Sequence, residues 1–151
     1  MLSENAKHLI ATFPLGFVAT VMPEGRPAVS PKGTFLVLGD GAIGFGNIRS
    51  PGTLRNLARA PWAEVNFIDQ WKRKGLRVRG TARVAASGSA EFNALIGIWQ
   101  AKWGDLAGRI TDLVLIDIEA AREVTTPPYD DGMTEAEMVA AYVAKFKEIY
   151  P

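Results

Sequence analysis

The pattern of apolar and polar positions predicts a run of strands set between helices. Short apolar or alternating stretches bounded by Gly, Pro and Asp indicate strands, and these lie at 15–22, 27–38, 42–47, 63–69, 76–86 and 112–124. Apolar residues at helical spacing predict helices, which lie at 3–12, 51–60, 89–103 and 134–150. Two of these helices carry N-terminal signals, Ser3 as a cap and Thr134 with Glu137 as a capping box.

The connections between the predicted strands decide the fold class. Most neighbouring strands are joined by tight turns, such as Gly39-Asp40-Gly41, which favours antiparallel pairing. Pro31-Lys32-Gly33 interrupts the second strand and indicates a bulge or an edge. We therefore expect a mainly β, α+β fold, a closed or half-open antiparallel barrel with peripheral helices. The chain is expected to be one domain over 1–151, with the barrel at about 13–124 and the C-terminal helix at about 134–150.

Composition narrows the classes of function. The chain has no cysteine, which excludes disulfides and thiol catalysis, and its one histidine, His8, argues against a catalytic triad or a histidine metal site. We therefore expect no metal site. No apolar run approaches the roughly 20 residues of a membrane span, and the N-terminal residues lack a signal-peptide pattern, so a cytoplasmic protein is expected. Residues 1–111 carry 14 basic and 7 acidic side chains, whereas residues 112–151 carry 3 and 9.

Two short segments form a candidate anion site. In FGNIRSPGTLRNLARAP (45–61), Ser50, Pro51 and Thr53 begin a helix, and Arg49 and Arg55 flank that start. A helix N-terminus with hydroxyls and cations suits a phosphate monoester, although on this segment alone ordinary capping is the simpler explanation.

The second segment is VSPKGT (29–34), in which Ser30, Lys32 and Thr34 would share a strand face. Hairpin pairing across the Asp40-Gly41 turn would bring this strand close to 46–50. The sequence thus places Lys32 and the start of the helix around one anion, while a solvated strand face remains the alternative.

A third segment supports a different class of function. WKRKGLRVRGTAR (71–83) contains six basic residues and no acid. Aromatic and basic side chains on a barrel surface also suit a groove for single-stranded nucleic acid. The alternative is a solvated loop and strand face.

Residues 13 to 86 resemble the pyridoxamine 5′-phosphate oxidase-like FMN-binding split barrels. The resemblance is carried by FVATVMPEGRPAVSPKGTF, FGNIRSPGTLRNL, AEVNFID and GLRVRGTARV. It implies a six-stranded split barrel that forms a homodimer, with FMN in clefts at the subunit interface. It also implies a set of cofactor-binding residues: Ser30, Lys32, Gly33 and Thr34 along the flavin, Asn47 and Ile48 at its ring system, Arg49, Ser50 and Thr53 at the phosphate, and Trp71 to Lys74 from the partner subunit.

The chain departs from the oxidase itself at the C-terminus, where the last forty residues are acidic and contain no histidine. Oxidation of pyridoxamine phosphate is therefore not expected, and the substrate stays open. We expect an FMN-dependent oxidoreductase in which the flavin carries out the chemistry and no side chain is an obligatory nucleophile. Lys32 could stabilise the reduced flavin, in which case Lys32→Met lowers its reduction potential. The alternatives are a deazaflavin cofactor, a non-catalytic flavin-binding or redox-sensing module, and a nucleic-acid-binding barrel.

Overall fold

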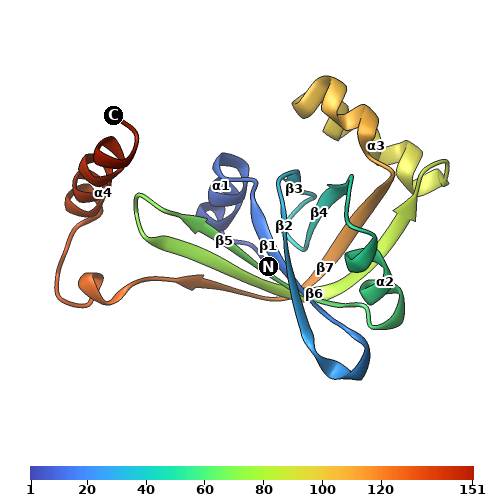
Figure 1. The fold of residues 1–151 in the computed structure, drawn as a ribbon, viewed down its shortest axis with the longest axis horizontal. Coiled ribbons are helices and arrows are strands. Elements are labelled where there is room, and N and C mark those ends of the chain that lie inside the picture. The colour runs from blue at the N-terminus through green and yellow to red at the C-terminus, as the bar shows by residue number, and fades with distance from the viewer.

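The computed structural model describes residues 1–151 and contains four α-helices and seven β-strands (Figure 1). The helices are α1 (Glu4–Thr12), α2 (Pro51–Arg59), α3 (Ala90–Trp103) and α4 (Glu135–Ile149). The strands are β1 (Gly16–Val21), β2 (Pro27–Lys32), β3 (Phe35–Val37), β4 (Ala42–Asn47), β5 (Trp62–Asp69), β6 (Lys74–Ala86) and β7 (Asp112–Val124). Each predicted helix is present, and each element other than the second predicted strand lies within two residues of its predicted bounds.

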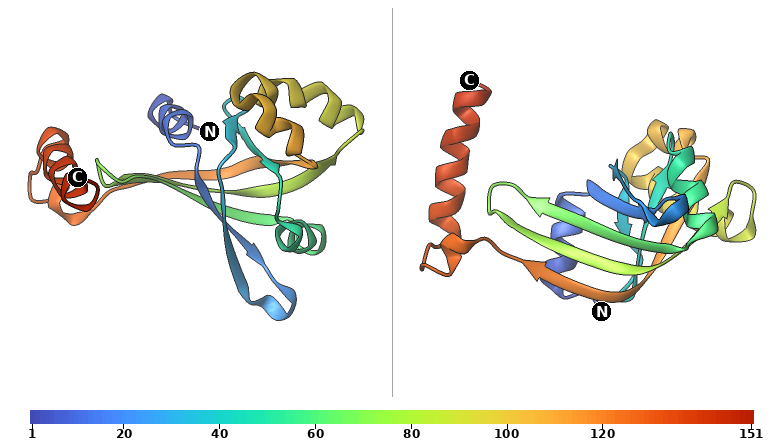
Figure 2. Two further views of the ribbon diagram at one scale, coloured as in Figure 1. Left: turned by 45° about the horizontal axis from the view of Figure 1, so that its top comes forward. Right: turned by 60° about the horizontal axis from the view of Figure 1, so that its bottom comes forward.

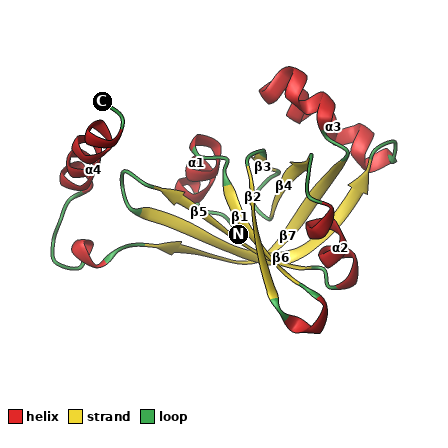
Figure 3. Ribbon diagram, viewed as in Figure 1, coloured by secondary structure: helices red, strands yellow, loops and turns green.

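All strands belong to one antiparallel sheet with the order β2-β1-β5-β6-β7-β4-β3. β2 and β3 follow each other in the chain but lie at opposite edges of the sheet. The sheet must therefore curl so that its edges approach each other, which gives the half-barrel of Figure 3. The predicted antiparallel split barrel is confirmed.

The predicted second strand, 27–38, is divided in two, which raises the strand count from six to seven. The predicted interruption at Pro31-Lys32-Gly33 is confirmed at Gly33, where the break begins, but not at Pro31 and Lys32, which still lie within β2. Pro31 is tolerated because β2 is an edge strand, where a missing N–H costs no ladder hydrogen bond.

The two longest strands, β6 and β7, lie side by side in the middle of the curved sheet, where β5 pairs with β6 and β4 pairs with β7 (Figure 2). Their register shifts between Arg79 and Gly80. A Cβ atom at Gly80 would lie 2.0 Å from the carbonyl oxygen of Asp117, so only glycine fits at this bulge. The bulge bends the strands and thereby helps the sheet to curl.

Two apolar clusters stabilise the fold. The barrel core lies inside the curled sheet and includes Val18, Phe35, Phe45, Val65 and Phe67. The α3 core lies beneath α3, and its buried members are Ala85, Phe92, Trp99, Ala107, Ile110, Leu113 and Leu115. The apolar residues predicted at helical spacing over 89–103 therefore form core, with Phe92 and Trp99 buried and Leu95 and Ile96 packed against them. None of the four helices is long and apolar enough to cross a membrane.

α4 stands apart from the barrel, as two views show (Figures 1 and 2). Its first turn has the predicted capping box between Thr134 and Glu137. Only one of its residues, Met138, is buried. The helix contacts the body through the loop between β5 and β6, where Trp71 lies against Phe146 with ring centroids 5.1 Å apart.

Candidate functional site: an anion-binding cavity

The start of α2 leaves its first backbone donors free. Ser50 occupies the N-cap position, but its side chain makes no capping hydrogen bond. The expectation that Ser50 caps this helix through its hydroxyl is therefore wrong. Pro51 has no N–H, and no side chain accepts from Gly52 or Thr53. Free N–H groups and the helix dipole together make this end of α2 electropositive.

The Ser50 hydroxyl is instead held by Lys32. The Lys32 ammonium donates to Ser50 Oγ and, at 2.7 Å, to Ser30 Oγ. Because each serine oxygen accepts from the ammonium, its own O–H hydrogen is free to donate elsewhere. The predicted meeting of Lys32 with the start of the helix is thus confirmed by a direct contact.

Lys32 is a buried cation without a carboxylate partner. Its residue is 6% exposed, and no salt bridge includes it. Burial disfavours the charged form, so the pKa of the Lys32 ammonium lies below its ordinary value. An anion bound nearby would supply the missing opposite charge.

Ser30 and Ser50 line a cavity of about 680 Å³ between α2 and the β1–β2 hairpin, two elements that lie together in Figure 1. The lining contains three arginines and no acidic residue; its members are Thr20, Met22, Pro23, Ala28, Ser30, Arg49, Ser50, Pro51, Gly52, Thr53, Arg55, Asn56 and Arg59. None of the arginines forms a salt bridge. The cavity therefore concentrates unpaired positive charge.

The arginines lie around the first turns of α2. The Arg55 side chain extends back toward the start of α2. Its Nη2 atom lies 3.9 Å from the position that a Cβ atom at Gly52 would occupy. Arg59 is one turn further along α2 and donates from Nη2 to the Val21 carbonyl of the hairpin. Guanidinium groups, serine hydroxyls and free backbone N–H groups are donors that suit a phosphate dianion.

Two more predicted residues serve structure at the edge of this site. Thr34 is buried, and its hydroxyl donates to the Gly46 carbonyl and accepts from the Gly46 N–H, both at 3.0 Å. Thr34 therefore does not share the free face of Ser30 and Lys32, because its side chain replaces a ladder hydrogen bond where the strand breaks. Ile48 packs against the α3 core.

Asn47 has a free acceptor. Its Nδ2 atom lies 3.4 Å from Thr111 Oγ1, whereas its buried Oδ1 atom has no hydrogen-bond partner. A buried carbonyl oxygen without a donor is costly, so this atom suits a ligand N–H or O–H.

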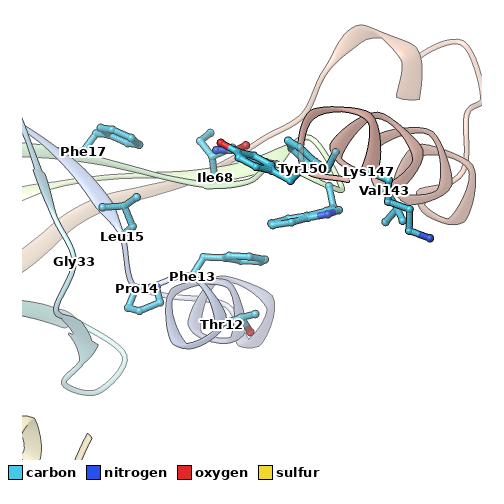
Figure 4. Close-up of a pocket in the computed structure, with 13 residues that line it drawn as sticks. Thr12, Phe13, Pro14, Leu15, Phe17, Gly33, Ile68, Val143, Lys147 and Tyr150 are labelled. Atoms are coloured by element: carbon cyan, nitrogen blue, oxygen red, sulfur yellow. The ribbon is translucent and has the colours of Figure 1, made fainter. Parts of the chain in front are cut away.

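Gly33, Trp71 and Lys74 do not line the anion cavity. Gly33 and Trp71 line a separate aromatic groove of about 740 Å³ between α4 and the barrel. Figure 4 shows Phe13, Leu15, Phe17 and Ile68 along its barrel side, and Val143 and Tyr150 on the side of α4. Lys74 pairs with Glu135 at 2.8 Å. The predicted contribution of Trp71 and Lys74 to a partner subunit's site stays a prediction, and so does the predicted contact of Gly33 with the flavin.

The basic segment 71–83 is largely neutralised within the chain. Lys72 and Lys74 pair with Glu135, and the arginines of β6 pair with acids on neighbouring elements: Arg77 and Arg79 with Glu64, and Arg83 with Glu91 and Asp117. The guanidinium of Arg73 lies over the Tyr142 ring. The segment thus holds strands and α4 together, which leaves little unpaired charge for a nucleic acid.

The sequence interpretation missed some of the lining, mainly Thr20, Asn56 and Arg59. Arg55 and Arg59 are four residues apart on a predicted helix, so they share a face. That spacing could have added Arg59 to the candidate anion site from the sequence alone. Thr20 could not be found in this way, because only the pairing of β1 with β2 brings it to the cavity.

Solved structures share this fold at low sequence identity. HupZ of Group A Streptococcus is 24% identical, with a TM-score of 0.71 over 83% of this chain and 96% of that one. An FMN-binding protein from Syntrophomonas wolfei is 16% identical, with a TM-score of 0.68 over 82% of this chain and 86% of that one. HutZ, a heme storage protein from Vibrio cholerae, is 19% identical, with a TM-score of 0.65 over 80% of this chain and 93% of that one. These likenesses show the fold alone.

The sequence gives a more specific assignment. No curated protein sequence matches the chain. The sequence model of the pyridoxamine 5′-phosphate oxidase family matches residues 2–126, which is most of the chain and includes the whole sheet and the anion cavity. The chain therefore belongs to the pyridoxamine 5′-phosphate oxidase family.

Proposed function

We propose that this protein binds FMN and that the anion cavity holds the 5′-phosphate of the cofactor. The observation that carries the proposal is a cavity with three arginines that form no salt bridge, free helix N–H groups and no acidic residue. A phosphate monoester dianion supplies the charge that this donor set lacks. The family match and the FMN-binding protein of the same fold support FMN as the molecule that carries that phosphate.

In this proposal Arg49, Arg55, Ser50 and Thr53 contact the phosphate. Lys32 lies behind Ser30 and Ser50, so it acts on the phosphate through the two hydroxyls and by its charge. These contacts support a role for Lys32 at the phosphate end of the site, which we propose in place of the expected role at the flavin ring. We propose that the buried Asn47 oxygen, which has no donor in the chain, accepts from a cofactor N–H or O–H group.

We further propose that the protein is an oxidoreductase acting on a small molecule. Bound FMN supplies hydride or electron transfer. The residues described above bind and orient the cofactor, and none of them is assigned an acid–base or nucleophilic role. The acidic C-terminal segment, which contains no histidine, gives no support to pyridoxamine phosphate as the substrate.

We also propose that two copies of the chain associate through the outer face of β1, β2 and β5. Apolar side chains gather there with much of their surface exposed: Phe17 43%, Val29 66% and Ile68 40%. Phe17 lies beside Pro31 of β2 and Asn66 of β5 in the sheet, so this surface is continuous. It also continues into the aromatic groove, which Phe17 and Ile68 line. A second copy would cover this apolar area.

The cofactor is identified by the absorption spectrum of the purified protein, before and after addition of FMN. The proposal predicts flavin bands and FMN released on denaturation, and reduction of the bound flavin by NADH or NADPH would support the oxidoreductase assignment. An intense Soret band would indicate heme instead. A protein that neither contains nor takes up flavin would contradict the proposal.

The phosphate assignment is tested by an affinity ratio. FMN and riboflavin differ only by the phosphate, so the ratio of their affinities, called here the FMN/riboflavin ratio, isolates its contribution. Arg55→Ala should lower this ratio about tenfold or more, because a hydrogen bond to a charged group contributes about 1.5–3 kcal/mol. Arg109→Ala is the matched control, since Arg109 is exposed, forms no salt bridge and lies outside the cavity. An equal effect of both variants would argue against the assignment.

A further inference from the structure

α3 contributes no residue to the anion cavity, yet one of its side chains holds the backbone on which the cavity depends. Trp99 is fully buried in the α3 core. Its indole Nε1–H donates to the carbonyl oxygen of Thr34 at 2.8 Å, and this hydrogen bond is buried. Thr34 lies at the break between β2 and β3, where the backbone has left the regular ladder.

Thr34 in turn connects the two segments that carry the site. Its hydroxyl both donates to and accepts from the backbone of Gly46. Thr34 is two residues after Lys32, and Gly46 is four residues before Ser50. The single link from Trp99 through Thr34 to Gly46 therefore fixes the start of β3 against β4, close to both partners of the Lys32–Ser50 contact.

Packing leaves this link little freedom. A Cβ atom at Gly46 would lie 2.4 Å from Cδ1 of Ile110, which is another member of the α3 core. The α3 core thus packs directly against Gly46 through Ile110, and it hydrogen-bonds to Thr34 through Trp99. Because protein interiors are close-packed, a shift of either contact moves the strand ends that follow.

We propose that Trp99 is a positioning residue for the anion site, acting through Thr34 on the relative placement of Lys32 and Ser50. This inference rests on the proposed phosphate site. Removal of the indole N–H leaves the Thr34 carbonyl buried without its donor, so the strand break loses one of the bonds that define it. The ammonium then no longer meets Ser30 and Ser50 in the geometry that directs their hydroxyl hydrogens into the cavity.

The test compares Trp99→Phe with Trp103→Phe. Trp103 lies on the same helix and packs against the same core, but its indole makes no hydrogen bond within the chain, so it is the matched control. We expect Trp99→Phe to lower the FMN/riboflavin ratio about tenfold and Trp103→Phe to leave it unchanged. A purely structural role for Trp99 would lower the thermal stability and leave the ratio unaltered, and that result would overturn the inference.

Thr34 provides a second test if Trp99→Phe does not fold. Thr34→Ser keeps the hydroxyl that bonds Gly46, whereas Thr34→Val keeps the shape and removes it. The inference expects the FMN/riboflavin ratio to be retained in Thr34→Ser and to fall in Thr34→Val. Equal ratios in these two variants would contradict it. If the wild-type protein itself bound FMN and riboflavin equally, the proposed phosphate site would fail, which is a different outcome.

Discussion

At the scale of single residues, the most informative side chain is Lys32. A buried ammonium normally has a carboxylate partner, because desolvating an unpaired charge is costly. Lys32 has two serine hydroxyls and no acid. The unpaired, buried ammonium therefore lowers the stability of the ligand-free fold. A bound anion would offset this loss of stability, because it supplies the missing opposite charge.

The destabilising effect of Lys32 on the ligand-free protein should decrease as the pH rises. The pKa of Lys32 is lowered in the folded state, so the unfolded chain binds this proton more tightly. The destabilisation is fully present below the folded pKa and fades as the pH rises toward the ordinary value of 10.5. Lys32→Met removes this effect. The free energy of unfolding of the variant minus that of the wild type should therefore be larger at about pH 7 than at about pH 10.

Urea unfolding of both proteins at the two pH values provides this measurement. The difference between them isolates Lys32, because other shifted groups, such as Lys7 and Lys74, are present in both. A difference that does not change with pH would show that Lys32 is not a strained, buried cation.

Sequence reasoning identified much of this site because its signals are local. Ser50, Pro51 and Thr53 are adjacent at the start of a helix, and one hairpin turn was enough to place Lys32 beside Ser50. It could not foresee that Lys32 would take the Ser50 hydroxyl away from the helix. It also could not foresee the role of Thr34, because that depends on where the strand breaks. Both are consequences of tertiary packing.

At the scale of elements, the curvature of the sheet depends on glycine. Gly80 lies at the β6–β7 bulge, where a Cβ atom would clash with the Asp117 backbone, whereas a Cβ atom at Gly97 in α3 would meet nothing within 4 Å. The same substitution should therefore have opposite effects at the two positions. This contrast tests whether the bulge shapes the half-barrel.

Gly80→Ala should destabilise the protein by about 3 kcal/mol or more, because backbone atoms cannot move away as a flexible side chain can. Gly97→Ala should stabilise it by about 0.5–1 kcal/mol, since alanine loses less conformational entropy in a helix. Thermal unfolding followed by circular dichroism measures both. Similar destabilisation by both variants would refute the described bulge geometry.

The attachment of α4 is the second point at this scale. The helix is fixed at its start by Glu135 with Lys72 and Lys74, and along its side by Phe146 against Trp71. The ion pairs are exposed and contribute little, so the aromatic contact should dominate. Phe146→Ala is expected to speed amide hydrogen exchange throughout α4 and to leave β5 to β7 unchanged.

Glu135→Gln is the matched comparison for this experiment, because it removes the ion pairs and keeps the aromatic contact. It should accelerate exchange in α4 much less than Phe146→Ala does. The reverse order would mean that charge, and not aromatic packing, holds the helix.

At the scale of the whole molecule, the sequence predicted the barrel and its helices but not how α4 is placed. Alternating burial and tight turns are local properties, so the strands could be read from the pattern of residues. The long-range acid–base pairs, such as Glu135 with Lys74, have no local signal. For the same reason the basic segment 71–83 could be read as a nucleic-acid groove, although most of its charges are paired in the folded chain.

The proposed association of two copies is tested by charge insertion. Phe17→Glu should shift the protein from dimer to monomer in sedimentation velocity, because it places a carboxylate at the centre of the apolar face. Ile98→Glu is the control, since Ile98 is equally prominent, 47% exposed, but lies on α3. A monomeric wild type, or dissociation by the control alone, would contradict the assigned face.

The central claim is that the cavity at the start of α2 holds the phosphate of a flavin. Isothermal titration of the flavin-free, wild-type protein with FMN and with riboflavin tests it most directly. Two or more charge-assisted hydrogen bonds to the phosphate predict an FMN/riboflavin ratio of about 100 or more, and this ratio should fall as salt is added. Equal affinity for the two flavins, or binding of neither, would contradict the claim.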